Sequence, residues 1–384
     1  MTRAISLFSV GMAMFSMFFG AGNVVFPLIV GQATTDNSLF AMAGLVLTAV
    51  GIPFTGVIAM ALYDGNYKEF FSRLGKWPGF IVPLIIMGLI GPFGCMPRCI
   101  ALSYSTMKMF FPEIGVVLFG ILSCLAIYAT SIKKSRVIDF VGWILTPFFL
   151  FAIGFIVVMG LVNHPGELQP STYMPVDSFV YGLQSGYHTM DLLASFFFCG
   201  VVIGALRKIS HVNGQLDRSL AVKNSLIAAG IGAFLLASVY IGMSLVAALH
   251  STKLVGVSAE MLLGTVALEV LGPSAGIVTC VAVVMACLTT AIALAAVVSD
   301  YFQQELLKDK ASYRTSLILT LVVTFLVSTL EFQGIFKLLG PVVQVLYPAL
   351  LILSLVNIAY KVWGFDNVKF PVASAFGMTL LFSV

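Results

Sequence analysis

Long apolar runs, separated by Pro, Gly or charged residues, occupy nearly the whole of this chain. Within a bilayer every backbone polar group must be paired internally, so only α-helices and closed barrels span it. A spanning helix requires about 20 mainly apolar residues, which is near the length of most of these runs. The chain is 60% hydrophobic and 9% charged, against about 45–50% and 25% in soluble domains. We therefore expect an all-α polytopic membrane protein.

The runs number about twelve when one span takes roughly 20 residues, and the last four are short. No connection has the composition of a folded soluble domain, so we interpret residues 1–384 as a single membrane transport domain. The first run resembles a secretory signal after Arg3, but its hydrophobicity continues to Val30 without a cleavage site, and we expect it to remain as the first span. The predicted spans lie at residues 5–32, 38–62, 79–110, 114–131, 137–162, 178–206, 222–250, 272–303, 315–330, 332–346, 347–361 and 368–384.

Positive charge is distributed unevenly among the connections. If the N-terminus is cytoplasmic, the even-numbered connections lie in the cytoplasm and carry most of the cations. The odd-numbered connections lie on the outer side of the membrane and carry few, and Lys361 and Lys369 are expected on that outer side. This bias predicts that both termini are cytoplasmic. The net charge of +4 is then a topology signal, and we expect contact with the lipid bilayer and no nucleic acid. The cations of the even-numbered connections are Lys68, Arg73, Lys76, Lys133, Lys134, Arg136, Arg207, Lys208, Arg218, Lys223, Lys308, Lys310 and Arg314.

The first span is interrupted in its middle by Gly20, Ala21, Gly22 and Asn23, followed by Pro27. Glycine also serves close packing between membrane helices, and that interpretation stays open. Asn23 adds a polar side chain, however, and Pro27 removes a backbone donor one turn later. Together these residues favour an unwound stretch that lines a cavity.

The sixth span carries His188, Thr189, Met190 and Asp191 within an otherwise apolar sequence. A charge at the centre of a spanning helix costs about 2.5–3.5 kcal/mol on insertion scales and usually marks a substrate or ion pathway. Asp191 either contacts the substrate or ion directly or holds the broken helix in place through hydrogen bonds. His188 is either a hydrogen-bonding or gating residue or a proton carrier.

Interruptions in the first and sixth spans match transporters made of two five-span inverted repeats, whose half-helix ends converge at the middle of the membrane. Residues 1–162 and 177–346 would form these repeats, and residues 347–384 would supply two additional helices. The segment at 258–271 has helical character outside the spans, as a lid over an entry path or as a passive linker.

The eighth span contains Ala286, Thr289 and Thr290. Two adjacent hydroxyls and a carbonyl one turn earlier are hard oxygen ligands, which a small hard cation prefers. The absence of a neighbouring carboxylate suits a monovalent ion. The alternative is that each hydroxyl simply bonds to a carbonyl of its own helix.

The third span is irregular at residues 91–94 and carries a cation, Arg98, at membrane depth. Arg98 either closes a gate with a carboxylate or extends its head to the membrane surface. Cys95 and Cys99 share a helix face, but no clustered His or carboxylate completes a metal site. All six cysteines fall inside apolar runs, so we expect them to pack between helices rather than to form disulfides.

Five segments carry a recognisable series of motifs: FFGAGNVVFP at 18–27, GPFGCMPRCIALSY at 91–104, SGYHTMDLLASFFFCGVVIGALR at 185–207, CLTTAIAL at 287–294 and LYPALLIL at 346–353. In this order they resemble the bacterial branched-chain amino acid:cation symporter family, of the amino acid–polyamine–organocation superfamily. The resemblance implies a LeuT-type 5+5 inverted-repeat fold plus two extra helices. It also implies sodium-coupled uptake of Leu, Ile and Val across the bacterial cytoplasmic (inner) membrane, with sodium as the coupling ion and no cofactor.

The resemblance also assigns roles to residues of this chain. The amides of the first break would bind the substrate carboxylate and the second break its amino group. Neighbouring Phe and Met would line a pocket for an aliphatic side chain, and the last predicted span is short for this family. The implied substrate contacts are Gly20, Ala21, Gly22, Asn23, Thr189, Met190 and Asp191. The implied sodium ligands are the carbonyls of Ser16, Phe19 and Ala286 and the hydroxyls of Thr289 and Thr290.

We expect a secondary transporter that works by alternating access. An enzyme would require converging catalytic groups, and a channel would require a filter ring or a repeated polar face; the sequence has only a lone intramembrane Asp and scattered His. The open alternative is a proton-coupled transporter of another small amino acid or related solute on the same fold, with Asp191 or His188 titrating.

Overall fold

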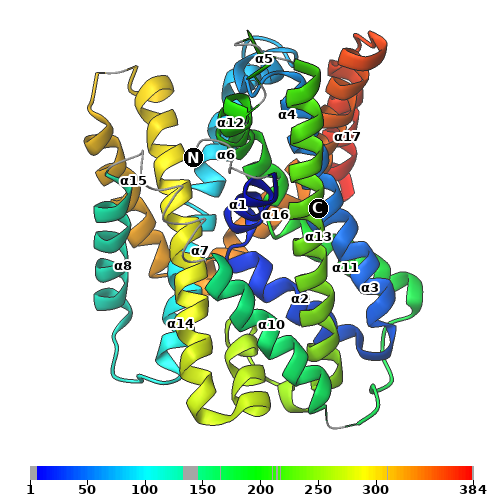
Figure 1. Cartoon of the computed structure of the whole chain (residues 1–384), viewed down its shortest axis with the longest axis vertical. Helices are drawn as coiled ribbons and strands as arrows, with labels where there is room; N and C mark the ends of the chain where they lie inside the picture. The colour runs from blue at the N-terminus through cyan, green and yellow to red at the C-terminus, as the bar shows by residue number, and fades with distance from the viewer. Residues whose placement is uncertain are drawn as a thin grey trace.

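The computed structural model describes residues 7–132, 146–164, 166–209, 211–212, 215–216, 218–308 and 310–382. These residues are almost entirely helical (Figure 1). Within them the only sheet is a two-residue antiparallel hairpin, β1 (His211–Val212) with β2 (Gln215–Leu216). The first part of the predicted fifth span, 137–145, and the cluster of Lys133, Lys134 and Arg136 lie outside the described residues.

The first half of the chain follows the predicted spans closely. The first span is divided into two helices, the second contains a π-helical turn, and the third is divided by a turn at residues 91–94. The elements are α1 (Leu7–Phe18), α2 (Ala21–Thr34), η1 (Thr35–Asn37), α3 (Ser38–Val46), η2 (Leu47–Gly51), α4 (Ile52–Leu62), α5 (Tyr67–Ser72), α6 (Pro78–Ile90), α7 (Cys95–Lys108), α8 (Val116–Ser131) and α10 (Thr146–Val162).

The second half begins with a divided sixth span and ends with two antiparallel helices. Its elements are α11 (Pro175–Tyr187), α12 (Asp191–Ile209), α13 (Arg218–Leu249), η4 (Ser251–Leu254), η5 (Ala259–Met261), α14 (Leu262–Tyr301), η6 (Phe302–Leu306), α15 (Tyr313–Ser328), α16 (Glu331–Trp363) and α17 (Lys369–Phe382). Within α14, Gly272 has φ 73° and ψ 177°, so the expected helical segment at 258–271 is separated from the eighth span by a kink.

Five helices of the described part are long and apolar enough to cross a membrane, and the bent pair α11 and α12 makes a sixth. Four shorter apolar helices accompany them. In Figure 1, α8 and α15 form one edge of the molecule, α17 lies at the other, and α1 is in the middle. The chain is therefore a multi-pass membrane protein whose broken first span lies at its centre.

Glycines allow α3 and α11 to pack with their backbones close together. A Cβ on Gly182 would lie 1.9 Å from the Ala41 carbonyl oxygen, and a Cβ on Gly186 would lie 1.9 Å from Thr48 Oγ1. Small residues at helix contacts are the usual means of close approach in membranes. This contact holds the first half of the broken sixth span against the second span.

The predicted tenth and eleventh spans, 332–346 and 347–361, are one helix, α16, so the prediction of two segments is wrong. Pro341 and Pro348 lie inside this helix. A proline breaks a helix in water, but in a membrane unwinding leaves several polar groups unpaired, and neighbouring side chains satisfy those that proline frees. Pro348 lacks the N–H that would bond the Gln344 carbonyl, and Thr379 of α17 donates to the next carbonyl, that of Val345, at 3.1 Å. The described residues thus contain a single additional helix, α17, and not two.

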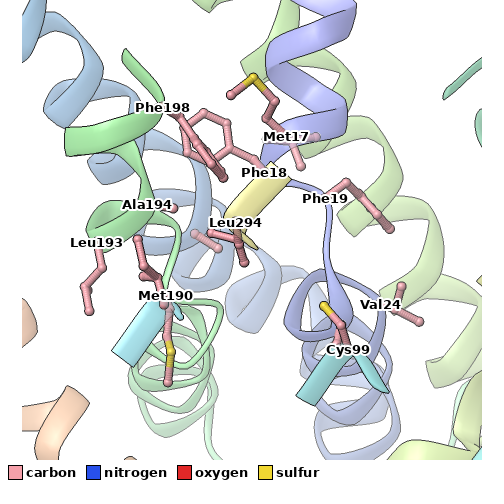
Figure 2. Close-up of a cluster of buried hydrophobic side chains, with 14 of the residues drawn as sticks. Met17, Phe18, Phe19, Val24, Cys99, Met190, Leu193, Ala194, Phe198 and Leu294 are labelled. Atoms are coloured by element: carbon pink, nitrogen blue, oxygen red, sulfur yellow. The ribbon is translucent and has the colours of Figure 1, made fainter. Parts of the chain in front are cut away.

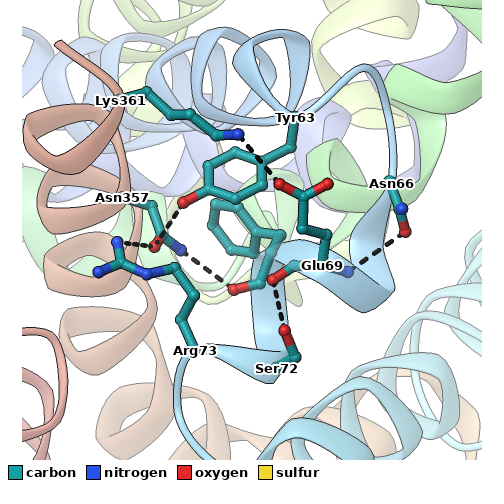
Figure 3. A network of polar contacts seen from close by, with 8 residues as sticks. Tyr63, Asn66, Glu69, Ser72, Arg73, Asn357 and Lys361 are labelled. Carbon is teal, nitrogen blue, oxygen red and sulfur yellow. Dashed lines mark hydrogen bonds and ion pairs between the residues drawn. The ribbon is translucent and has the colours of Figure 1, made fainter. Parts of the chain in front are cut away.

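A polar network fixes the end of α16 (Figure 3). Asn357 Oδ1 accepts from Arg73 Nη1 and from the Tyr63 hydroxyl, both at 3.1 Å, and its amide donates to the Phe70 carbonyl at 3.3 Å. Lys361 pairs with Glu69 at 3.0 Å. The C-terminal end of α16 therefore lies against α5, in the connection between the second and third spans.

This network corrects the predicted topology. The sequence predicts Lys361 on the opposite side of the membrane from Arg73, but both residues lie at the same end of the molecule. Lys369 lies there too, because its Cε would be 3.8 Å from a Cβ added to Gly75. The error arose because one helix was counted as two, which reversed the direction of every later span. The expectation of a cytoplasmic C-terminus depended on that count and loses its basis, whereas the two lysines now add to the positive charge at the α5 end.

Candidate substrate and ion site

The first break lies between α1 and α2, at Phe19 and Gly20. The helical ladder of α1 ends with the bond from the Phe19 N–H to the Phe15 carbonyl at 2.8 Å, and the Gly20 N–H turns instead to Asn23 Oδ1 at 3.2 Å. The last carbonyls of α1 and the first amides of α2 therefore face the same gap without helical partners. A helix C-terminus attracts cations and an N-terminus attracts anions, so this gap offers both kinds of end.

The second break lies between α11 and α12, which are bent by 42°. Thr189 N–H donates to the Gly186 carbonyl at 3.3 Å and Met190 N–H to the Tyr187 carbonyl at 3.2 Å, which closes a turn. Met190 has φ 63°, a left-handed conformation that costs a non-glycine residue about 1–3 kcal/mol and is concentrated at functional sites. Asp191 is the first residue of α12.

The two breaks are in direct contact. A Cβ on Gly22 would lie 3.1 Å from Thr189 Cα, so only glycine fits there without displacing the backbone. Asn23 Nδ2 donates to Asp191 Oδ2 at 2.6 Å and also bonds the Tyr240 hydroxyl, which in turn donates to the same carboxylate oxygen at 3.3 Å. Asp191 therefore ties the broken first span, the broken sixth span and α13 together.

A small cavity of about 20 Å³ lies between the breaks, which is space for about one water molecule in the present conformation. Its lining includes all seven residues predicted to contact substrate: Gly20, Ala21, Gly22, Asn23, Thr189, Met190 and Asp191. Its apolar wall is formed by Met17, Phe18, Ala194, Phe198 and Leu294, which gather around the break between α1 and α2 in Figure 2. The cavity thus combines two helix ends and a carboxylate with an aliphatic and aromatic wall.

The five residues implied as sodium ligands belong to the end of α1 and to α14, which a hydrogen bond joins at Thr290 and Phe19. Thr290 Oγ1 donates to the Phe19 carbonyl at 2.9 Å, and Thr289 Oγ1 donates to the Ala286 carbonyl at 2.7 Å. Ser16 is buried in the last turn of α1. The bond expected by the alternative interpretation is thus present for Thr289, whereas Thr290 joins two helices. Of the five, Thr290 alone lines the cavity, which places this group beside the cavity rather than within it.

The oxygens at this contact retain the capacity to bind a cation. A hydroxyl that donates its hydrogen still has two lone pairs, and a carbonyl accepts more than one partner. The part of the chain that the structure describes contains no group of three or more His, Cys, Asp or Glu side chains able to hold a metal. A cation at this contact would therefore depend on neutral oxygens, which suits a monovalent ion.

An aromatic layer covers one side of the breaks. The His188 ring stacks on Phe26 with centroids 5.6 Å apart and meets Phe336 edge-on at 4.8 Å. Phe26 and Phe336 are 5.8 Å apart. His188 is 7% exposed, and its contacts join α2, the sixth span and α16. This packing favours a gating role for His188 over that of a proton carrier.

The structure excludes one of the two predicted roles of Arg98, and its role in a gate with a carboxylate stays a prediction. Arg98 is 2% exposed, so it does not extend to the membrane surface. No carboxylate of the described residues forms an ion pair with it. Its Nη1 donates to the His188 carbonyl at 2.9 Å, and its guanidinium carbon lies 5.2 Å from the ring centroids of both Phe26 and Phe332. Arg98 also lines the cavity.

Sequence reasoning missed two groups at the site. Tyr240 contacts Asp191, and the only available signal was a tyrosine in the middle of an apolar seventh span. Phe198 and Leu294 belong to the cavity wall, but in sequence they are indistinguishable from the many apolar residues that pack elsewhere.

The cysteines pack between helices, as the sequence predicts. All six are free, and Cys199, for example, contacts the Val57 carbonyl of another helix at 3.3 Å.

Comparison with known proteins identifies the family. Residues 3–384 match the family model described as branched-chain amino acid transport protein. The chain belongs to this family. The branched-chain amino acid permease BrnQ of Bacillus subtilis is 30% identical to it over 364 residues, covering 92% of this chain and 81% of the permease. The BrnQ of Corynebacterium glutamicum is 31% identical over 358 residues, again with 92% and 81% covered.

Solved structures show the fold of this branched-chain amino acid transport protein. The inward-facing conformation of Mhp1 aligns with a TM-score of 0.68 and 12% identity, covering 99% of this chain and 90% of Mhp1. MhsT in complex with L-phenylalanine aligns with a TM-score of 0.65 and 15% identity, covering 99% of both chains. The predicted LeuT-type fold with broken first and sixth helices is thus confirmed. As a member of a transport family, the protein is a transporter and not an enzyme.

Proposed function

We propose that this protein is a sodium-coupled symporter that carries leucine, isoleucine and valine into the cytoplasm by alternating access. The observation that supports this most directly is the cavity between the two helix breaks, which combines anion-binding amides, a carboxylate and an apolar wall. A zwitterionic aliphatic amino acid has the three complementary parts. The names of the relatives agree with that substrate class.

The substrate would bind with its carboxylate toward the start of α2 and its ammonium group toward Asp191. The first amides of α2, including Gly22 N–H, have no partner within the helix and lie at its positive end. Asp191 lines the opposite break and supplies the carboxyl group that would face the ammonium group. Met17, Phe198 and Leu294 then surround a branched side chain of four or fewer carbons by apolar contact.

Sodium would bind where Thr290 meets the Phe19 carbonyl, with Ser16, Ala286 and Thr289 completing the shell. An ion there joins α14 to the end of α1 and stabilises the broken first span in the form that binds substrate. Each ligand then raises the affinity for the other, which is the thermodynamic requirement for coupling. The membrane potential adds about 2.3 kcal/mol per charge per 100 mV to the inward driving force. No cofactor is involved.

The protein would lie in the bacterial cytoplasmic (inner) membrane with its N-terminus in the cytoplasm. The positive connection that contains Lys68, Arg73 and Lys76 would face the cytoplasm, and Lys361 and Lys369 lie at that same end. The aromatic layer of Phe26, His188 and Phe336 would then lie on the outer side of the cavity. In this arrangement it closes the outward path in the present conformation.

Proton coupling is the second candidate, and the buried hydrogen-bonded set of Asp191, Asn23 and Tyr240 is the observation that favours it. A carboxylate that bridges both breaks would change the contact between them on gaining a proton. This candidate requires no ion at Thr289 and Thr290. The two candidates therefore differ in the residues on which coupling depends.

The experiment that tests the proposal is uptake of labelled leucine into proteoliposomes under a sodium gradient or a proton gradient at equal membrane potential. The double variant Thr289→Ala/Thr290→Ala removes both hydroxyls, and Thr320→Ala is the matched control, since Thr320 is buried in α15 and bonds its own helix at 2.9 Å. Accumulation driven by sodium and lost only in the double variant is expected. Accumulation driven by protons and retained in the double variant would establish the second candidate, and the absence of leucine flux would refute the substrate.

A further inference from the structure

Two of the three nitrogens of the buried Arg98 guanidinium have no partner. Nη1 donates to the His188 carbonyl, but Nε and Nη2 have no hydrogen bond and are inaccessible from the surface. A buried donor left unpaired costs about 1–3 kcal/mol, and more when it is charged. Within the described chain no carboxylate is close enough to form an ion pair with it. Asp191 is near enough to interact with Arg98 through its charge, but it does not pair directly with the guanidinium, so Nε and Nη2 stay without a hydrogen-bond acceptor.

The two free nitrogens are arranged to receive a carboxylate. In a guanidinium the N–H groups of Nε and Nη2 point in the same direction and form one of its two forks for bidentate binding of an anion. The bond from Nη1 to His188 fixes the rotation of the plane. Phe26 and Phe332 flank the group at 5.2 Å, which restricts its movement and excludes water.

Arg98 is one of the residues around the cavity between the helix breaks, and its Nε and Nη2 contact no open space in the present conformation. Arg98 lines that cavity together with Asp191 and with the start of α2. Asp191 already accepts hydrogen bonds from Asn23 and Tyr240 and makes no ion pair with Arg98. An anionic group that enters the cavity is thus the partner that the guanidinium lacks.

We propose that Arg98 binds the carboxylate of the amino acid substrate through Nε and Nη2, beside the amides at the start of α2. This inference rests on the proposed function and adds a specificity-determining residue to its site. It makes the α-carboxylate an obligatory part of the substrate. A decarboxylated amine or a carboxamide of the same side chain leaves the fork unpaired and is rejected, because a site built to pair a polar group discriminates strongly against ligands that lack it.

The test is competition for labelled leucine binding to the purified full-length protein, with unlabelled leucine, leucinamide and isopentylamine as competitors. The variants are Arg98→Gln and Arg98→Lys. Lys108→Gln is the control, because it removes one positive charge from the same helix at its far end. In the wild type and in Lys108→Gln, leucine is expected to compete at least about 100-fold better than isopentylamine.

Arg98→Gln should lower leucine affinity by at least about 30-fold, the effect of truncating one partner of a buried charge pair. Isopentylamine affinity should change little, so the ratio between the two ligands collapses. Arg98→Lys keeps the charge but loses the fork, so its ratio of leucine to isopentylamine affinity should lie between those of the wild type and Arg98→Gln. It also serves as the test if Arg98→Gln does not fold. If both ligands weaken equally in these variants, Arg98 only supports the His188 turn and the proposal is wrong. If wild-type protein binds no leucine, the proposed function itself fails.

Discussion

The side-chain amide of Asn23 donates to the carboxylate of Asp191 at 2.6 Å, which joins two helix breaks that are 168 positions apart in the chain. Both residues are nearly inaccessible, at 1% and 3% exposure. The bond makes the geometry of one break dependent on the other. A ligand that binds in the cavity between them is therefore in contact with both repeats at once.

Asn23→Ala should destabilise the protein by about 1–3 kcal/mol, because it leaves the Gly20 N–H without a partner and the buried Asp191 carboxylate with only the hydrogen bond from Tyr240. Leucine affinity should fall as well, since the break loses its fixed shape. Thermal unfolding in detergent followed by intrinsic fluorescence, with and without leucine, measures both effects. Asn37→Ala is the control, because Asn37 makes a comparable amide bond at 2.8 Å on the exposed surface; an equal loss in both variants would contradict the assignment.

Thr290→Val should weaken sodium activation of transport, whereas Thr290→Ser should leave it near the wild-type value. Valine has almost the same shape as threonine, so packing against Gly20 is retained and only the hydroxyl near the Phe19 carbonyl is lost. We expect the sodium concentration for half-maximal uptake to rise by at least about 10-fold, the effect of losing a bond of about 1.4 kcal/mol. Sodium titration of leucine uptake decides the point, and an unchanged midpoint in the Val variant removes Thr290 from the ion site.

Gly186→Ala should push α11 away from η2, because the added methyl group would lie 1.9 Å from Thr48 Oγ1. Such overpacking typically costs about 1–3 kcal/mol, and here the displaced helix also carries the second break. Gly154→Ala in α10 is the matched control, since nothing lies within 4 Å of its added Cβ. Melting temperatures of the two purified variants are the measurement, and a Gly186 variant as stable as the control would contradict the close contact between Gly186 and Thr48.

Cysteine labelling should place Lys361 on the same side of the membrane as Lys76. The pairs of Lys361 with Glu69 at 3.0 Å and of Arg73 with Asp366 at 2.9 Å require this arrangement. Lys361→Cys and Lys76→Cys should react with a membrane-impermeant maleimide in inside-out vesicles and be protected in right-side-out vesicles. Glu113→Cys, in the following connection, should show the reverse. Opposite labelling of the first two would restore the interpretation of α16 as two spans.

The sequence alone determined the class of protein and the position of both breaks. Long apolar runs of near 20 residues can cross a bilayer only as helices, so composition and run length were sufficient to determine the class of protein. Glycine, asparagine and aspartate within apolar runs are local signals, and the structure places the breaks at Gly20 and at Thr189, where those residues stand. The motifs also carried the family resemblance, which the family match confirms.

Tertiary structure decided what those local signals left open. Pro341 and Pro348 locally predict helix ends, yet they lie inside α16, because within a membrane a continuous helix keeps most backbone groups paired and an unwound segment would not. The partners of Asp191 could not be found from sequence, since Asn23 and Tyr240 reach it only when three helices pack together. The free fork of Arg98 is likewise a property of the packed helices: burial, a single carbonyl partner and a cavity are determined by residues far apart in the chain, whose distances no local pattern encodes.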